Sequence, residues 1–206
     1  SWINFHWFYF QPVEITRLLL AVGLAAIAEA RSREIRHWTG LIPPVFLAGS
    51  HFGMILLQPD LSSALAIGPM TLAVLFAAGA PTGALAALLA TGGLALGLPL
   101  ASTYFSIVGD RYATGTTMAW VARAFQETGP LLALAGGAAV LLVFGYWFLR
   151  RWRVSVPLFA LFVSLAVLVA GVAGSFVVDK ALKTYQRKRL IAFIDPAVDP
   201  LGAGYN

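Results

Sequence analysis

The chain has 206 residues, of which 59% are hydrophobic and only 11% charged, and its formal net charge is +5. Soluble domains are typically about a quarter charged, so this chain has too few charged residues to coat a globule of its size. In a chain this apolar, the basic residues are expected to mark membrane topology and an anionic ligand rather than nucleic acid. The sequence contains no cysteine, which excludes disulfides and thiolate metal sites.

The charged residues are clustered, and the stretches 38–59, 61–109, 130–149 and 154–178 contain none. A bilayer-spanning helix needs about 20 apolar residues, and the longest of these stretches is long enough for two. Backbone polar groups inside a bilayer must be satisfied internally, so the stretches are expected to be helical. We predict an all-α, polytopic transmembrane helical bundle with about six spans, at residues 13–30, 40–57, 61–79, 83–101, 129–149 and 154–178.

The loops between the predicted spans indicate an orientation. Residues 31–36 and 150–153 each carry three arginines, and short basic loops usually lie on the cytoplasmic side of a membrane. Counting the spans between them places both loops on the same face, as that rule requires. Residues 179–206 then fall on the opposite, extracytoplasmic face together with Glu14 and Asp60. Because an external basic segment opposes the usual bias, we interpret it as a site for an anionic substrate.

The first motif, Phe10-Gln-Pro-Val-Glu14, opens the first predicted span. Its proline suits the first helical position, and Glu14 would stabilise the positive end of the helix dipole. A functional interpretation is equally open, because Glu14 and Arg17 share a helix face just inside the membrane. Ionisable residues within a membrane usually face a cavity and carry function.

The second motif, Gln58-Pro-Asp60-Leu, lies between two predicted spans. The structural interpretation, which this motif alone favours, is that the proline ends one helix and Asp60 caps the next. The alternative is that a carboxylate at the membrane surface binds a cation or orients a sugar.

The third motif joins the basic segment Tyr185-Gln-Arg-Lys-Arg189 to the loop Asp195-Pro-Ala-Val-Asp199-Pro-Leu-Gly-Ala-Gly-Tyr205. A solvated loop with Asp-Pro turns is the structural interpretation. The functional one is that arginines recognise phosphate through their planar guanidinium. A neighbouring carboxylate would then act as general base on a sugar hydroxyl.

Together these motifs resemble the SEDS family, the RodA, FtsW and SpoVE-type membrane proteins of cell elongation, division and sporulation. The matching blocks are Trp2-Ile with Phe10-Gln-Pro-Val-Glu14, then Leu57-Gln-Pro-Asp60-Leu, and then the segment from Tyr185 to Tyr205. The last block is highly specific, whereas the first two alone would be weak. The resemblance covers about half of a typical member, from just before its fourth transmembrane helix into its large extracytoplasmic loop.

The resemblance implies an enzyme, a peptidoglycan glycosyltransferase of the bacterial cytoplasmic (inner) membrane. Such an enzyme polymerises lipid II, the undecaprenyl-pyrophosphate disaccharide-pentapeptide, into glycan strands on the extracytoplasmic face and releases undecaprenyl pyrophosphate. A class B penicillin-binding protein is the expected transpeptidase partner. No organic cofactor is expected. A divalent cation, Mg²⁺ or Mn²⁺, is a candidate aid to the reaction, and its ligands are unknown.

Residue by residue, the family's essential loop aspartate corresponds to Asp199, and its cavity glutamate to Glu14. Its basic residue in that helix corresponds to Arg17, and the aspartate of Gln-Pro-Asp to Asp60. We therefore expect Asp199 to be catalytic. The expected substrate-binding residues are Glu14, Arg17, Asp60, Arg187, Lys188 and Arg189.

Two departures from the family pattern stand out. Ser62-Ser63 replaces the usual Gly-Thr, and three spans instead of one separate the Gln-Pro-Asp helix from the catalytic loop. We expect residues 83–149 to be an inserted helix pair with its loop, within a single membrane domain of residues 1–206. Residues 179–206 would form the extracytoplasmic catalytic loop. The alternatives are a lipid II flippase or transporter and a non-catalytic scaffold of the cell-wall synthesis complex.

Overall fold

The computed structural model describes residues 3–4, 9–58, 60–108, 127–152, 156–183, 186–187 and 191–192, with backbone alone at 3–4, 9–10, 61–62 and 106–108. Helices occupy the places of all the predicted spans: α1 (Pro12–Ala30), α2 (Ile42–Leu57), α3 (Leu61–Ala77), α4 (Thr82–Val108), α6 (Thr128–Arg151) and α7 (Leu158–Ala181). The short strands β1 (Ile3–Asn4) and β2 (Tyr9–Phe10) pair antiparallel before α1. Two 3-10 turns, η1 (Glu34–Arg36) and η2 (Trp38–Leu41), connect α1 to α2.

Most of the described helices have the length and apolarity of membrane spans. Within the described ranges, four segments are long and apolar enough to cross a bilayer: Trp38–Leu57, Thr82–Phe105, Thr128–Arg151 and Leu158–Ala181. The apolar helix Ser63–Ala77 is shorter. The 19-residue helix α1 is not among these four segments and carries three charged residues, Glu14, Arg17 and Glu29. Large hydrophobic side chains are exposed along the helices, as lipid contact requires. The predicted all-α transmembrane class is confirmed.

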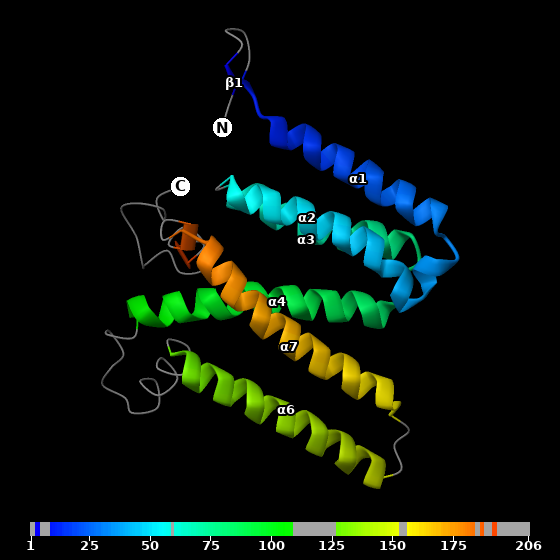
Figure 1. Cartoon of the computed structure of the whole chain (residues 1–206), viewed down its shortest axis with the longest axis vertical. Helices are drawn as coiled ribbons and strands as arrows, with labels where there is room; N and C mark the ends of the chain where they lie inside the picture. The colour runs from blue at the N-terminus through cyan, green and yellow to red at the C-terminus, as the bar shows by residue number, and fades with distance from the viewer. Residues whose placement is uncertain are drawn as a thin grey trace. The chain divides into compact units, whose positions relative to one another are not determined.

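The chain divides into two compact units, Ser1–Leu89 and Ala90–Asn206. In the first unit, α1, α2 and α3 pack against one another (Figure 1). Buried residues of all three helices, including Leu20, Ala48 and Ile67, form one core cluster. A second cluster joins Ala28 near the end of α1 to Leu75 near the end of α3, together with Ile35, Leu41, Ala80 and Ala84 from the segments that follow these helices. Because the starts of α1 and α3 also contact each other, the two helices run in the same direction.

A glycine ends α3. Gly79 has a φ of 83°, in the left-handed region that glycine adopts at little cost. Its N–H donates to the carbonyl of Phe76 at 3.0 Å, and the N–H of Ala80 donates to the carbonyl of Leu75 at 3.0 Å. This pair of hydrogen bonds is a Schellman motif, which satisfies the last carbonyls of the helix. The predicted span 61–79 therefore ends as a helix at Ala77.

The second unit contains α6 and α7, which pack against each other, and the later part of α4 (Figure 1). The close approach of α7 to α4 depends on two glycines of α7. A Cβ added at Gly171 would lie 2.6 Å from the Cβ of Leu94, and one at Gly174 would lie 3.0 Å from the Cβ of Ala95. By contrast, an added Cβ meets nothing within 4 Å among the described residues at Gly136. Small residues therefore allow close packing on α7.

Candidate functional site

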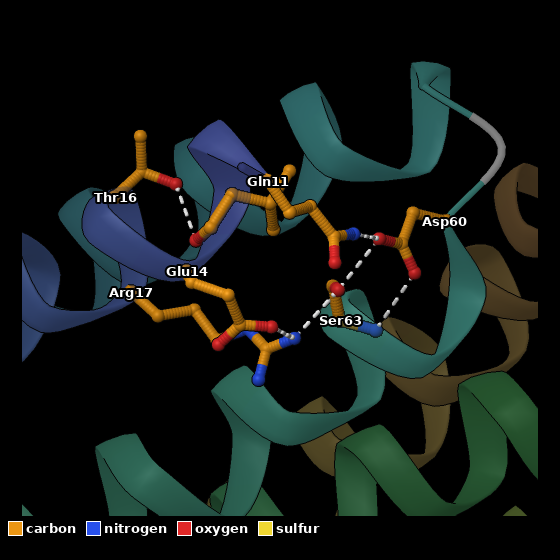
Figure 2. Close-up of polar contacts among 7 residues, drawn as sticks. Gln11, Glu14, Thr16, Arg17, Asp60 and Ser63 are labelled. Carbon is orange, nitrogen blue, oxygen red and sulfur yellow. Dashed lines mark hydrogen bonds and ion pairs between the residues drawn. The ribbon is translucent and has the colours of Figure 1, made fainter. Parts of the chain in front are cut away.

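Five polar side chains meet where α1 and α3 begin, and we call them the α1–α3 polar cluster (Figure 2). Gln11, Glu14 and Arg17 come from the start of α1, and Asp60 and Ser63 come from the start of α3. The cluster lies within the first unit of the chain. It brings together Glu14, Arg17 and Asp60, three of the residues that the sequence predicts as substrate-binding.

Asp60 is the N-cap of α3, as its motif predicts. Its Oδ1 accepts a hydrogen bond from the backbone N–H of Ser63 at 3.1 Å. Its Oδ2 accepts from the side-chain amide Nε2 of Gln11 at 2.9 Å and from the hydroxyl of Ser63 at 2.6 Å. The carboxylate thus caps its own helix and also binds Gln11, the N-cap residue of α1 (Figure 2).

Arg17 links the two helices from the other side. Its Nη2 donates to the Oγ of Ser63 at 2.6 Å and forms an ion pair with the Oε1 of Glu14 at 3.0 Å. The Arg17 side chain is 25% exposed and that of Glu14 is 56% exposed. The Nε of Arg17 is buried and has no hydrogen-bond partner in the described part of the chain. The Glu14 carboxylate is therefore the most accessible charge of this ion pair.

The local sequence explains why these groups gather. A proline occupies the first turn of α1, where its missing N–H costs nothing, and Glu14 follows in the same turn. The parallel arrangement of α1 and α3 places two positive helix-dipole ends side by side, which favours the carboxylates of Glu14 and Asp60. Arg17 lies three residues after Glu14, on the same helix face. Two carboxylates and one guanidinium leave the cluster with one net negative charge.

Arg187, in the second unit, is bound to the end of α7. Its Nη1 pairs with the Oδ1 of Asp179 at 2.8 Å, its Nη2 donates to the backbone carbonyl of Asp179, and its Nε donates to the carbonyl of Leu182 at 3.3 Å. The last carbonyls of a helix lack partners within the helix, and a cation there also opposes the negative dipole end. All three guanidinium nitrogens of Arg187 thus anchor the chain to α7, and the predicted role in substrate binding stays a prediction.

The remaining predicted site residues, Lys188, Arg189 and Asp199, lie outside the described residues. Among the residues that the structure does describe, no group of three or more His, Asp or Glu side chains is arranged to hold a metal ion.

The sequence did not single out Gln11 and Ser63 as site residues. One signal was available for Ser63, since residue N3 of a helix commonly exchanges hydrogen bonds with the N-cap residue, and Ser63 is three residues after Asp60. The hydroxyl of Ser63 lies at the second of the two positions where Ser62-Ser63 replaces the family's usual Gly-Thr. For Gln11 the partner is 49 positions away, which no local pattern indicates.

The fold and the cluster define an integral membrane protein with a polar site at the shared end of two parallel helices. The family model of the FtsW, RodA and SpoVE proteins, described as cell cycle proteins, matches residues 1–127. That match covers more than half of the chain, and the chain belongs to this family, the SEDS proteins.

Curated relatives match a shorter stretch. The chain is 33% identical over 81 residues to a protein of Acinetobacter baylyi and 36% identical over 80 residues to one of Tolumonas auensis, both named probable peptidoglycan glycosyltransferase FtsW. These matches cover 39% and 38% of this chain but only 20% and 21% of the relatives. The chain therefore matches about a fifth of the length of these relatives. No solved structure gives a significant match.

The matched residues, 1–127, contain the whole α1–α3 polar cluster. They also contain α4, which the sequence analysis assigned to the inserted helix pair of residues 83–149. The basic segment and Asp199 lie beyond residue 127. The inserted pair, the single membrane domain of residues 1–206 and the catalytic loop of residues 179–206 stay predictions.

Proposed function

We propose that this chain belongs to a peptidoglycan glycosyltransferase that polymerises lipid II on the extracytoplasmic face of the bacterial cytoplasmic membrane. Membership of the SEDS family supports the class of protein. The observation that carries the proposal is the α1–α3 polar cluster, which lies within the family-matched residues at one end of apolar helices. A polar, charged site at that position suits a substrate with a lipid tail and a polar headgroup.

The cluster has groups suited to a lipid headgroup. The exposed carboxylate of Glu14 accepts hydrogen bonds from sugar hydroxyls or amides, and the Arg17 guanidinium donates to phosphate or carbonyl oxygen. Asp60 fixes the start of α3 through its cap, so these groups stand on rigid elements. In this proposal Glu14 and Arg17 contact lipid II, and Asp60 shapes the site that receives it.

Asp199 is the proposed general base. It takes the proton from the 4-hydroxyl of N-acetylglucosamine on the acceptor lipid II. That oxygen bonds to the anomeric carbon of the donor N-acetylmuramic acid, and the bond from this carbon to the pyrophosphate oxygen breaks. Undecaprenyl pyrophosphate leaves with the electron pair. Its developing negative charge would be stabilised by Lys188 and Arg189, which follow the anchored Arg187, and by Mg²⁺ or Mn²⁺ if the reaction uses one.

The proposal also includes a partner. In this proposal the glycan strands are cross-linked by a separate transpeptidase after they are made. A class B penicillin-binding protein is the proposed transpeptidase. Its effect would be measured as the change in glycan yield when it is added to the purified polymerase.

Purified full-length protein, reconstituted in liposomes with lipid II, tests the activity. The proposal predicts glycan strands on a gel from the wild type and none from Asp199→Asn, with both proteins inserted and equally stable. Polymer at the wild-type rate from Asp199→Asn would refute the role of Asp199. Transbilayer movement of lipid II without polymer would indicate a flippase, and neither activity would indicate a scaffold.

A further inference from the structure

We propose that Ser63 is a positioning residue whose hydroxyl couples Asp60 to Arg17. Asp60 and Arg17 both contact Ser63, one on each side of the same oxygen atom (Figure 2). The contact of Arg17 with a lipid headgroup rests on the function proposed above. The coupling between Asp60 and Arg17 through Ser63 does not depend on that function.

The chemistry fixes the direction of both hydrogen bonds. An ionised carboxylate only accepts and a guanidinium only donates, while a hydroxyl has one hydrogen and two lone pairs. The hydroxyl of Ser63 must therefore give its hydrogen to the Oδ2 of Asp60 and accept from the Nη2 of Arg17, each at 2.6 Å. Hydrogen bonds to charged groups are shorter and stronger than neutral ones.

Burial makes the hydroxyl hard to replace. Ser63 is only 2% exposed, so water has little access to take over its two contacts. Hydrogen bonds in series also polarise one another, and they are stronger away from water. Without this hydroxyl, the partner left to Nη2 of Arg17 among the described residues is Glu14, whose side chain is 56% exposed. The guanidinium would then be held by a solvent-exposed partner on its own helix instead of by the capped start of α3.

The side chain of Ser63 can be tested apart from helix capping. The cap uses the backbone N–H of Ser63, at 3.1 Å from the Oδ1 of Asp60, and Ser63→Ala retains that group. Ser63→Thr retains both the N–H and the hydroxyl. Ser50 provides a matched control, because its hydroxyl donates to the carbonyl of Leu47 in its own helix at 2.8 Å.

The first measurement is a double-mutant cycle on thermal unfolding, with Asp60→Asn and Arg17→Gln. With Ser63 present, the double variant is expected to lose less than the sum of the single losses, by about 2–4 °C in Tm. With Ser63→Ala this coupling should vanish, and with Ser63→Thr it should return. If Ser63→Ala does not fold, Ser63→Cys, whose thiol is a weak donor and acceptor, takes its place and should also abolish the coupling.

Coupling that persists in Ser63→Ala would overturn the proposal. Persistence there, combined with loss in Gln11→Leu, would assign the coupling to Gln11, another side chain bound to Asp60. If Ser63 only fills space or supports the helix, Ser63→Ala would lower Tm without changing the coupling between Asp60 and Arg17.

Lipid II polymerisation gives the second measurement. Ser63→Ala should lower the rate at least about tenfold, Ser63→Thr should restore it to within about threefold, and Ser50→Ala should leave it unchanged. A wild type that makes no polymer would refute the proposed function, while the unfolding cycle would still decide the role of Ser63. Full activity in Ser63→Ala would contradict a positioning role.

Discussion

Gln11 and Asp60 are joined by a 2.9 Å hydrogen bond between the amide Nε2 and the carboxylate Oδ2, across 49 positions of the sequence. The bond ties the start of α1 to the start of α3, so both helix N-termini share one polar site. Asp60 thereby has two structural roles, since it caps α3 and accepts a hydrogen bond from Gln11 at the start of α1. Glu14 and Arg17, which form an ion pair, are the charged groups of the cluster that do not contribute to this cap.

The capping role of Asp60 can be separated by substitution from its hydrogen bonds to other side chains. Asp60→Ala removes the cap and the side-chain hydrogen bonds with Gln11 and Ser63, and it is expected to destabilise the protein by about 2–3 kcal/mol. Asp60→Asn keeps an oxygen for the cap and should cost about 1 kcal/mol. Thermal unfolding in detergent measures both. Equal losses in the two variants would contradict a capping role for this oxygen.

Gly171 should tolerate no side chain, because of its contact with Leu94. Gly171→Ala places a methyl group 2.6 Å from the Cβ of Leu94, and such overpacking typically costs about 1–3 kcal/mol. Gly136→Ala is the control, since nothing in the described residues lies within 4 Å of the added methyl. The expected result is a lower Tm for Gly171→Ala only. A larger drop for Gly136→Ala would show that the helices pack differently.

Arg187 and Asp179 should behave as one structural unit. If Arg187 mainly anchors the chain to the end of α7, Arg187→Gln and Asp179→Asn should lower Tm by similar amounts, and the double variant should lose less than their sum. Because both side chains are partly exposed, the coupling is expected to stay near or below about 1 kcal/mol. A loss of lipid II polymerisation in Arg187→Gln, with full activity in Asp179→Asn, would instead favour direct substrate binding by Arg187.

The sidedness of the α1–α3 polar cluster can be measured by labelling, because the chain contains no cysteine. Gln58, next to the start of α3, and Ser32, in the turn after α1, are both exposed. The account predicts that Gln58→Cys reacts with an impermeant maleimide in intact cells, and that Ser32→Cys reacts only after permeabilisation. The reverse pattern would place the cluster on the cytoplasmic face and exclude an extracytoplasmic polymerase site.

Much of this fold could be predicted from the sequence, because a polypeptide that crosses a bilayer must satisfy its backbone hydrogen bonds internally, which few structures do. Stretches without charge of the length of a membrane span became helices. The spacing of Glu14 and Arg17 predicted a shared helix face, on which the two side chains form an ion pair. Asp60 after a proline predicted the cap. These features depend on residues within one or two turns of each other, where helix geometry determines the contact.

The contacts between helices could not be predicted in the same way. Arg17 and Ser63 are 46 positions apart, and only the packing of α1 on α3 brings them together. Similarly, the sequence suggested phosphate for Arg187, but two of its partners are backbone carbonyls, which every residue has. A basic residue near the end of a helix is thus consistent with anchoring as well as with ligand binding.

The most direct test of the account compares two similar ion pairs at opposite ends of α1. Glu14–Arg17 belongs to the α1–α3 polar cluster, whereas Glu34–Arg31, at 2.9 Å, is an exposed pair in the following turn. Neither pair should contribute more than about 1 kcal/mol to stability. Lipid II polymerisation is therefore measured for Glu14→Gln and Glu34→Gln after thermal unfolding has shown that the two variants have the same Tm. Glu14→Gln is expected to lose at least about tenfold in rate, because it removes a charge that contacts the substrate, and Glu34→Gln is expected to keep full activity. Wild-type polymerisation by Glu14→Gln would contradict the account.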